Sequence, residues 1–229
     1  MRYQWLGHAS VRLEIEDQVL LIDPWQEGPT FPTDRADEAL GGATAIVLTH
    51  GHFDHAAGVA ELAKERGLTV YGMVELVSIL GEQFGIEVTG FNKGGTVQIG
   101  AVALTMVAAT HSSTLQMGEK LLPAGDPVGF MIAGEGKTVY LSGDTDVMAD
   151  MAIWQDLHAP EIGILSAGGH FTMDMRRAAY AASKLFRFKT VIPYHYKTFP
   201  LLAQDASELQ AALPGVTVHD PEVMEAIEL

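Results

Sequence analysis

The chain has 229 residues, a length typical of one domain, and its 14 basic and 29 acidic residues give a formal net charge of −15. This balance argues against broad non-specific binding to nucleic acid or to anionic membranes, because both reward lysine and arginine. Cysteine is absent, which excludes disulfides, thiolate metal ligands and cysteine nucleophiles. No apolar run approaches membrane-spanning length, and the N-terminal residues lack the apolar core of a signal peptide, so we expect a soluble, cytoplasmic protein.

The first half of the chain predicts a hairpin followed by alternating strands and helices. Val11–Ile15 alternates apolar and polar residues and pairs with the apolar run Val19–Asp23 through a predicted turn at Asp17-Gln18. Residues 24–42 carry three prolines and three glycines and predict a surface loop. The elements expected next are a strand Ala45–Leu48, a helix Ala56–Arg66, a strand Thr69–Tyr71 and a helix Val74–Phe84.

The second half repeats this order. Strands are predicted at Thr96–Ile99, Val102–Ala108, Val128–Ala133, Thr138–Ser142, Ile162–Ser166, Val191–Tyr194 and Val216–Val218. Helices are predicted from about Asp174 to Phe186, with Thr172 as N-cap, and at Ala206–Leu213. Strands followed by strand–helix units, twice over, favour mixed sheets with outer helices. We therefore predict one α/β domain spanning residues 1–229, in which two halves stack as a four-layer αββα sandwich.

The most informative segment is His50-Gly51-His52-Phe53-Asp54-His55, which follows an apolar strand and precedes a helix. Residues two apart in extended chain face the same side, so His50 and His52 can bind one ion. The turn into the helix then directs Asp54 and His55 at a neighbouring point. Neutral imidazoles with a carboxylate suit a borderline divalent metal.

Three further candidate ligands stand at the ends of later apolar strands, namely His111, Asp144 and His195. Ligands in α/β proteins gather at the carboxyl ends of strands. Any one of these residues alone would be read as a loop residue. Because they occur together with the histidine segment, the assignment of all three as metal ligands is strengthened.

With these residues in place, the sequence resembles the metallo-β-lactamase superfamily. The match consists of His50-x-His52-x-Asp54-His55, then His111, Asp144 and His195, in that order along most of the chain. Gly7-His8 and the segments 168–173 and 193–200 look like a narrower group of metal-dependent hydrolases, related to ascorbate-phosphate lactonases and to the N-acyl-phosphatidylethanolamine phospholipase D. Two residues depart from that pattern: Asp146 and Asp174 stand where the resemblance predicts glycine.

The resemblance implies two divalent metal ions as cofactors. His50, His52 and His111 would hold the first ion, Asp54, His55 and His195 the second, and Asp144 both. Zinc is the favoured ion, and nitrogen and oxygen ligands also accept manganese, iron, nickel or cobalt. A water between two such ions, about 3.5–4 Å apart, becomes a nucleophile near neutral pH, and the ions stabilise its attack as Lewis acids.

Four residues are candidates for supporting roles. Asp23 could orient a ligand histidine, or cap a turn. His8 could point into the site from the first hairpin, or be a turn histidine. His170 could protonate the leaving group, or lie on the surface. Lys197 could hold a phosphate or carboxylate, or be a solvated lysine.

The sequence thus predicts a metal-dependent hydrolase that attacks an ester, lactone or phosphodiester of a small anionic substrate. The alternatives are a phosphodiesterase or nuclease acting on nucleic acid, which the net charge disfavours, and a non-catalytic metal-binding regulatory protein. We also expect a few exposed apolar residues near Trp25, Phe31 and Trp154 to pack on a partner, which suggests a homo-oligomer.

Overall fold

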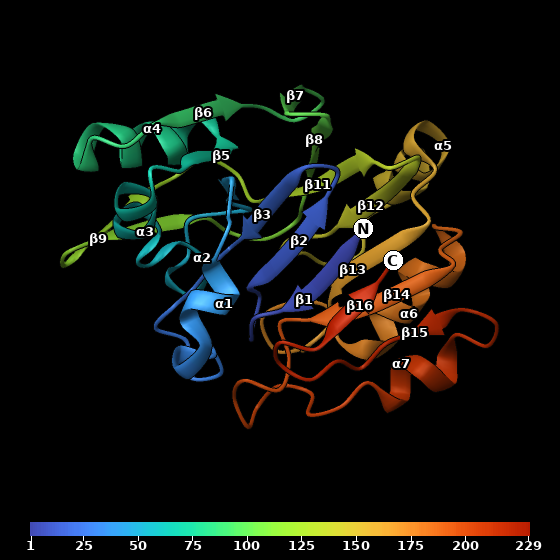
Figure 1. Cartoon of the computed structure of the whole chain (residues 1–229). Coiled ribbons are helices and arrows are strands. Elements are labelled where there is room, and N and C mark those ends of the chain that lie inside the picture. The colour runs from blue at the N-terminus through green and yellow to red at the C-terminus, as the bar shows by residue number, and fades with distance from the viewer.

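Two mixed β-sheets form the centre of the molecule, in a computed structural model that describes all residues, 1–229 (Figure 1). The first sheet has seven strands in the spatial order β16 (Ala226–Glu228), β1 (Arg2–Trp5), β2 (Val11–Ile15), β3 (Gln18–Ile22), β4 (Ala45–Val47), β5 (Thr69–Met73) and β6 (Val88–Phe91). The second also has seven, ordered β15 (Thr217–Val218), β14 (Thr190–Tyr194), β13 (Ile162–Ser166), β12 (Lys137–Leu141), β11 (Val128–Gly134), β8 (Val102–Ala108) and β7 (Thr96–Ile99). Each sheet is antiparallel in one half and parallel in the other, as the order of predicted elements indicates.

Helices cover the outer faces of both sheets (Figure 1). The first half contributes α1 (Ala36–Leu40), α2 (Phe53–Ala56), α3 (Val59–Arg66) and α4 (Val74–Phe84), and the second α5 (Asp150–His158), α6 (Met175–Lys184) and α7 (Ser207–Ala212). Helix α4 packs on β5 and β6, while α6 and α7 pack beside β13 and β15. The predicted four-layer αββα sandwich is confirmed. None of the helices combines the length and the apolar character needed to cross a membrane.

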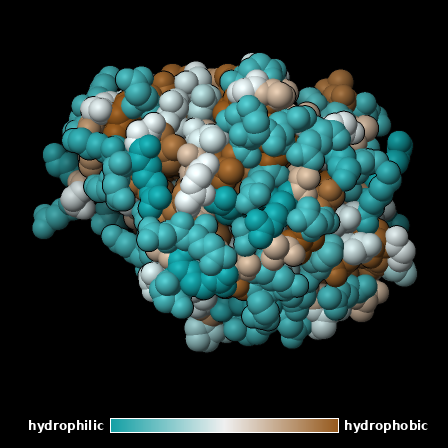
Figure 2. Space-filling model, viewed as in Figure 1, coloured by the Kyte–Doolittle hydropathy of each residue, from teal (hydrophilic) through white to brown (hydrophobic).

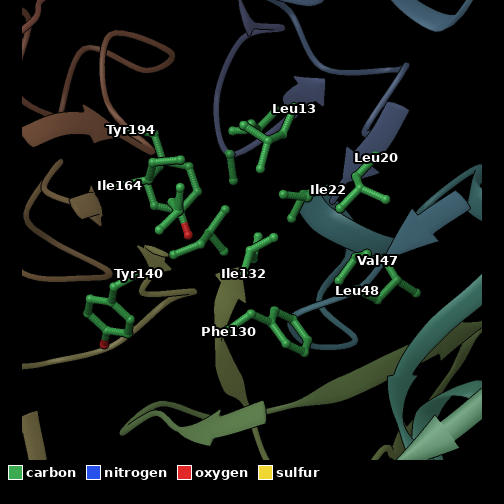
Figure 3. Packing of buried hydrophobic residues seen from close by; sticks show 14 of the residues in the cluster. Leu13, Leu20, Ile22, Val47, Leu48, Phe130, Ile132, Tyr140, Ile164 and Tyr194 are labelled. Atoms are coloured by element: carbon green, nitrogen blue, oxygen red, sulfur yellow. The ribbon is translucent and has the colours of Figure 1, made fainter. Parts of the chain in front are cut away.

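The core lies between the two sheets (Figure 3). Leu20 and Ile22 of β3 face Phe130 and Ile132 of β11, and all four are fully buried. Tyr140 points to the other side of its sheet, where its ring centre lies 5.9 Å from that of Trp154 on α5. Burying one large apolar side chain stabilises a fold by about 1.5–3 kcal/mol, so this layer holds the strand ends firmly in place.

Several boundaries differ from the predictions for local reasons. The first hairpin pairs Ile15 with Gln18, so its turn is Glu16-Asp17 rather than Asp17-Gln18. The predicted helix at Ala56–Arg66 is divided into α2 and α3, because Gly58 adopts a left-handed φ of 75° that no helix continues through. Helix α6 is capped by Asp174, whose carboxylate accepts the backbone N–H of Arg177, and not by Thr172.

Some elements carry too little periodicity to be predicted. The loop at residues 24–42 contains a 3₁₀ turn, Thr33–Arg35, and helix α1. Strands β1, β6 and β16 and helix α5 were not predicted either. A separate two-stranded sheet of β9 (Thr114–Met117) and β10 (Lys120–Pro123) extends from the body beside α3 (Figure 1). Short strands of this kind depend on pairing with neighbours rather than on intrinsic preference.

Exposed apolar residues do lie near one of the three aromatic residues that mark the expected oligomer contact. Trp25, Phe31 and Trp154 are themselves only 7%, 7% and 8% exposed, but Ile153 and Leu157, beside Trp154 on α5, are 56% and 70% exposed. The homo-oligomer stays a prediction. Most of the face in Figure 2 is hydrophilic, with hydrophobic residues in separate small patches. A single exposed residue such as Leu121 needs no partner to explain it.

Candidate metal centre

The carboxyl ends of several strands meet at one edge of the sandwich. In the first sheet β3 and β4 are parallel, and they lead into Asp23 and His50. In the second, β8, β12 and β14 run in one direction, because β11 is antiparallel to both β8 and β12. These three strands lead into His111, Asp144 and His195. The topology therefore gathers side chains that lie far apart in the sequence.

Strained backbone is concentrated at this edge. Nine non-glycine residues have a positive φ, and five of them are candidate site residues: His8, Asp23, His170, His195 and Lys197. Such conformations cost free energy and persist where the surrounding structure holds them, often at functional sites. One close approach explains Gly168, because a Cβ there would overlap the carbonyl oxygen of His195.

The first group of donors consists of His50, His52 and His111. His50 Nε2 lies 3.0 Å from His52 Nδ1, and one nitrogen of each of the three residues lies within 4.8 Å of the others. Two nitrogens bound tetrahedrally to one zinc ion, each about 2.0–2.1 Å from it, lie roughly 3.3 Å apart. The spacing of this group therefore fits a single metal ion.

The second group consists of Asp54, His55 and His195, and His8 joins it. Asp54 Oδ2 lies 3.8 Å from His55 Nε2, 3.6 Å from His195 Nε2 and 2.9 Å from His8 Nε2. These four donor atoms also lie within 4.8 Å of one another. His55, His195 and His8 are buried, whereas Asp54 is partly open to solvent.

Asp144 lies between the two groups. Its Oδ2 atom lies 3.1 Å from His195 Nε2, 3.4 Å from His55 Nε2, 3.6 Å from His111 Nε2 and 4.0 Å from His50 Nε2. One carboxylate oxygen is thus within 4.0 Å of imidazoles from both groups. Asp144 itself is only 1% exposed.

Charge is distributed unevenly over the cluster. Burial lowers the pKa of His50 well below its usual value. Burial opposes the charging of His195 as well, but the carboxylates of Asp144 and Asp54 outweigh it and raise its pKa to about 9. Although burial disfavours its charged form, Asp144 has a pKa held well below its usual value by His195 and His55. The carboxylates of the cluster therefore favour nearby positive charge.

Unpaired buried atoms identify where that charge fits. His55 Nε2, Asp144 Oδ1 and both ring nitrogens of His195 are buried and make no hydrogen bond. Buried polar groups in proteins are almost always paired, and a cation would pair these. Together with the donor chemistry, this shows that the residues fit a bound metal.

A second layer of hydrogen bonds orients two of the histidines. The Asp23 carboxylate accepts hydrogen bonds from Thr49 N at 2.8 Å, from Thr49 Oγ1 at 2.6 Å and from His55 Nδ1 at 2.8 Å. Thr49 Oγ1 also lies 3.0 Å from His50 Nδ1. Both imidazoles therefore carry their proton on Nδ1 and direct Nε2 toward Asp144. These contacts favour the orienting role for Asp23. Thr49 was not predicted, although its place directly before His50 was a usable signal.

His8 supports the same centre from the first sheet. It is 1% exposed and lies between β1 and β2. Burial lowers its pKa to about 4, so the ring is neutral near pH 7. A neutral ring donates from one nitrogen only, so Nε2–H donates to Asp54, and Nδ1 lies 2.8 Å from the Thr198 hydroxyl oxygen.

The other two predicted residues lie outside the cluster. His170 is exposed and lines a hollow of about 350 Å³ together with Thr110 and Thr145, which are neighbours of His111 and Asp144. Asp146 lines the same hollow and forms an ion pair with Arg177. Lys197 has local partners: its Nζ lies 2.8 Å from Asp220 Oδ1 and 5.2 Å from the ring centre of Tyr196. Lys197 thus has local partners for its charge, and its contact with a substrate stays a prediction.

Comparisons with known proteins agree with this geometry. A sequence model of the beta-lactamase superfamily domain matches residues 18–196. A UPF0173 metal-dependent hydrolase of Dinoroseobacter shibae is 62% identical, with both chains covered in full. The structure of Igni18, a metallo hydrolase of Ignicoccus hospitalis, has a TM-score of 0.86 and 30% identity over 99% of this chain and 97% of that one. The metallo-beta-lactamase fold protein YhfI of Bacillus subtilis shares the fold, with a TM-score of 0.75 and 15% identity over 99% of each chain. The chain therefore belongs to the metallo-β-lactamase superfamily and is one of its metal-dependent hydrolases.

Proposed function

We propose that this hydrolase uses two divalent metal ions to cleave an ester, lactone or phosphodiester bond in a small anionic substrate. In this assignment His50, His52 and His111 hold one ion, and Asp54, His55 and His195 hold the other. Asp144 contacts both. The observation that carries the proposal is the position of Asp144 Oδ2, within 4.0 Å of imidazole nitrogens from both groups.

Two bound ions would supply an acidified water and Lewis acids for the scissile bond, and zinc suits this donor set best. The chain supplies the geometry. Asp23 and Thr49 fix the rings of His55 and His50, and His8 fixes the Asp54 carboxylate. Because the donor set contains only two carboxylates, Asp54 and Asp144, two divalent ions leave a local positive charge. That charge favours an anionic substrate in spite of the acidic surface.

Proton delivery to the leaving group is assigned to His170. It lines a hollow whose wall includes the residue before His111 and the residue after Asp144. The loop carrying it is tied to the Asp144 loop, since Met173 N donates to Thr145 O at 3.1 Å. An imidazole in this position can protonate a leaving group that departs from the metal centre.

The test is hydrolysis of four substrates by metal-loaded protein: an activated phosphodiester, a lactone, a thioester and an amide. Metal content per chain is measured on the same samples. Asp144→Ala should lose most turnover and weaken both metal sites, whereas Asp156→Ala, at an exposed acid on α5, should change neither. Full turnover and two tightly bound ions in Asp144→Ala would refute the ligand assignment. Hydrolysis of the amide or the thioester alone would refute the proposed bond class.

A further inference from the structure

An apolar pocket opens beside the histidine segment. It has a volume of about 370 Å³, which is within the range of ligand-binding cavities. Its wall includes Gly51, between His50 and His52, and Phe53, between His52 and Asp54. The pocket therefore adjoins the metal centre through the chain itself.

Eight of the 13 residues that line this pocket are hydrophobic, one side is built from small residues, and polar atoms make up about half of the exposed wall. Its main apolar residues are Phe53, Ala56, Ala57, Ala60, Leu115 and Met117. The small alanine side chains of α2 and α3 leave room for the pocket, and strand β9 forms one of its side walls. Phe53 is 53% exposed, although it stands among polar ligands. Its ring centre lies 5.6 Å from that of Trp25, edge to face, and its open side contributes apolar surface to the pocket.

The charges around the pocket exclude an anionic occupant. Two acidic residues, Glu27 and Glu61, stand at its rim, and both are exposed. No lysine or arginine lines it. A carboxylate or phosphate placed here would meet like charge without a counter-ion. The buried part of the wall, which includes Ala56, Ala60, Leu80 and Leu115, offers no polar side chain.

We propose that this pocket binds an uncharged alkyl or aryl arm of the substrate, next to the bond that the metal centre cleaves. The inference rests on the proposed hydrolase function. It adds that the substrate is amphiphilic, with its charged part at the metals and its apolar part against Phe53. Each methylene buried in such a pocket should raise affinity about fourfold, from the usual transfer free energy of a methylene.

Calorimetric binding of neutral 1-alkanols with two to eight carbons to the metal-loaded protein tests the pocket without requiring turnover. Affinity should rise by about fourfold per methylene until the pocket is full. Ala57→Leu fills the space from a half-buried position with an unstrained φ of −65° and should abolish that rise. Met117→Gln keeps the volume but adds polarity and should weaken the rise. Ala152→Leu, a matched change at a half-buried alanine of α5, should leave it unchanged.

Each other outcome has a definite meaning. Affinity that ignores chain length, or that survives Ala57→Leu in a folded protein, refutes the pocket. Tighter binding of alkylammonium ions than of alkanols would assign it to a cationic arm instead. Dimerisation that Ala57→Leu abolishes would assign it to a second copy of the chain. If alkanols bind as expected but none of the four substrates is hydrolysed, the pocket stands and the proposed function fails. If the substrates are hydrolysed but no alkanol binds, the proposed function stands and the pocket fails.

Discussion

Replacing Asp23 by asparagine should weaken metal binding without placing any change among the proposed ligands. Three donors converge on the Asp23 carboxylate: the Thr49 N–H, the Thr49 hydroxyl and the His55 Nδ1–H. An amide offers one oxygen and turns an NH₂ group toward at least one of these donors. Asp23 is fully buried, so water cannot repair the mismatch.

The expected loss of metal affinity follows from the two histidines that Asp23 orients, one directly and one through Thr49. His55 is contacted directly, and loss of such an orienting carboxylate typically costs 10- to 100-fold in metal affinity, or about 1.4–2.8 kcal/mol. His50 is reached only through Thr49. Thr49→Val removes that contact and also the hydrogen bond from the Thr49 hydroxyl to Asp23, while the His55–Asp23 contact stays. It should therefore weaken mainly the site of His50, by roughly two- to tenfold.

Competition titration with a chelator measures both affinities for each variant. Asp23→Asn should lower mainly the affinity of the His55 site, and Thr49→Val mainly that of the His50 site. Asp34→Asn, at an exposed acid of the loop before α1, is the matched control and should change neither. If Asp23→Asn left both affinities within about twofold of the wild type while the protein stayed folded, the orienting role would be refuted.

Three further predictions concern other parts of the molecule. Chelation should lower the melting temperature, because each ion present at about 1,000 times its dissociation constant adds about 4 kcal/mol of stability; an unchanged melting temperature would contradict this. His170→Ala should slow substrates with alkoxide leaving groups at least tenfold but nitrophenyl substrates hardly at all, and equal losses would remove its acid role. Burial disfavours the charged form of Asp220, but Lys197 and Tyr196 outweigh it and lower its pKa, so its stabilising effect is full above about pH 4 and fades below; Asp220→Asn should thus lower the melting temperature more at pH 7 than at pH 3.

The site residues that could be predicted are those that lie close together in the sequence or directly follow a predicted strand. His50, His52, Asp54 and His55 lie within six positions, and their spacing alone places them together. His111, Asp144 and His195 follow apolar runs long enough to be recognised as strands. Helix α4 and most strands of the second sheet were predictable for the same reason, since both depend on strong local periodicity.

Asp23 and His8 were candidates for supporting roles, but the partners that their side chains contact could not be predicted, because these depend on backbone geometry that has no sequence signature. His8 and Asp23 reach the centre only because each adopts a left-handed φ, 47° and 46° respectively. Asp23 then meets His55, which is 32 positions away in the sequence. Apolar patterning gives the strands, but it does not give the direction of a side chain after a strand has ended.

Each proposed metal site draws its donors from both sheets. His50 and His52 follow β4 of the first sheet, whereas His111 follows β8 of the second. In the other group His8, Asp54 and His55 belong to the first half of the chain and His195 to the second. Neither half contains a complete set, so a bound ion would join the two layers of the sandwich at the edge where the strands end. Metal binding and sheet packing are therefore coupled, and a core substitution that loosens the packing, such as Phe130→Ala between the sheets, should weaken metal binding even though it touches no ligand.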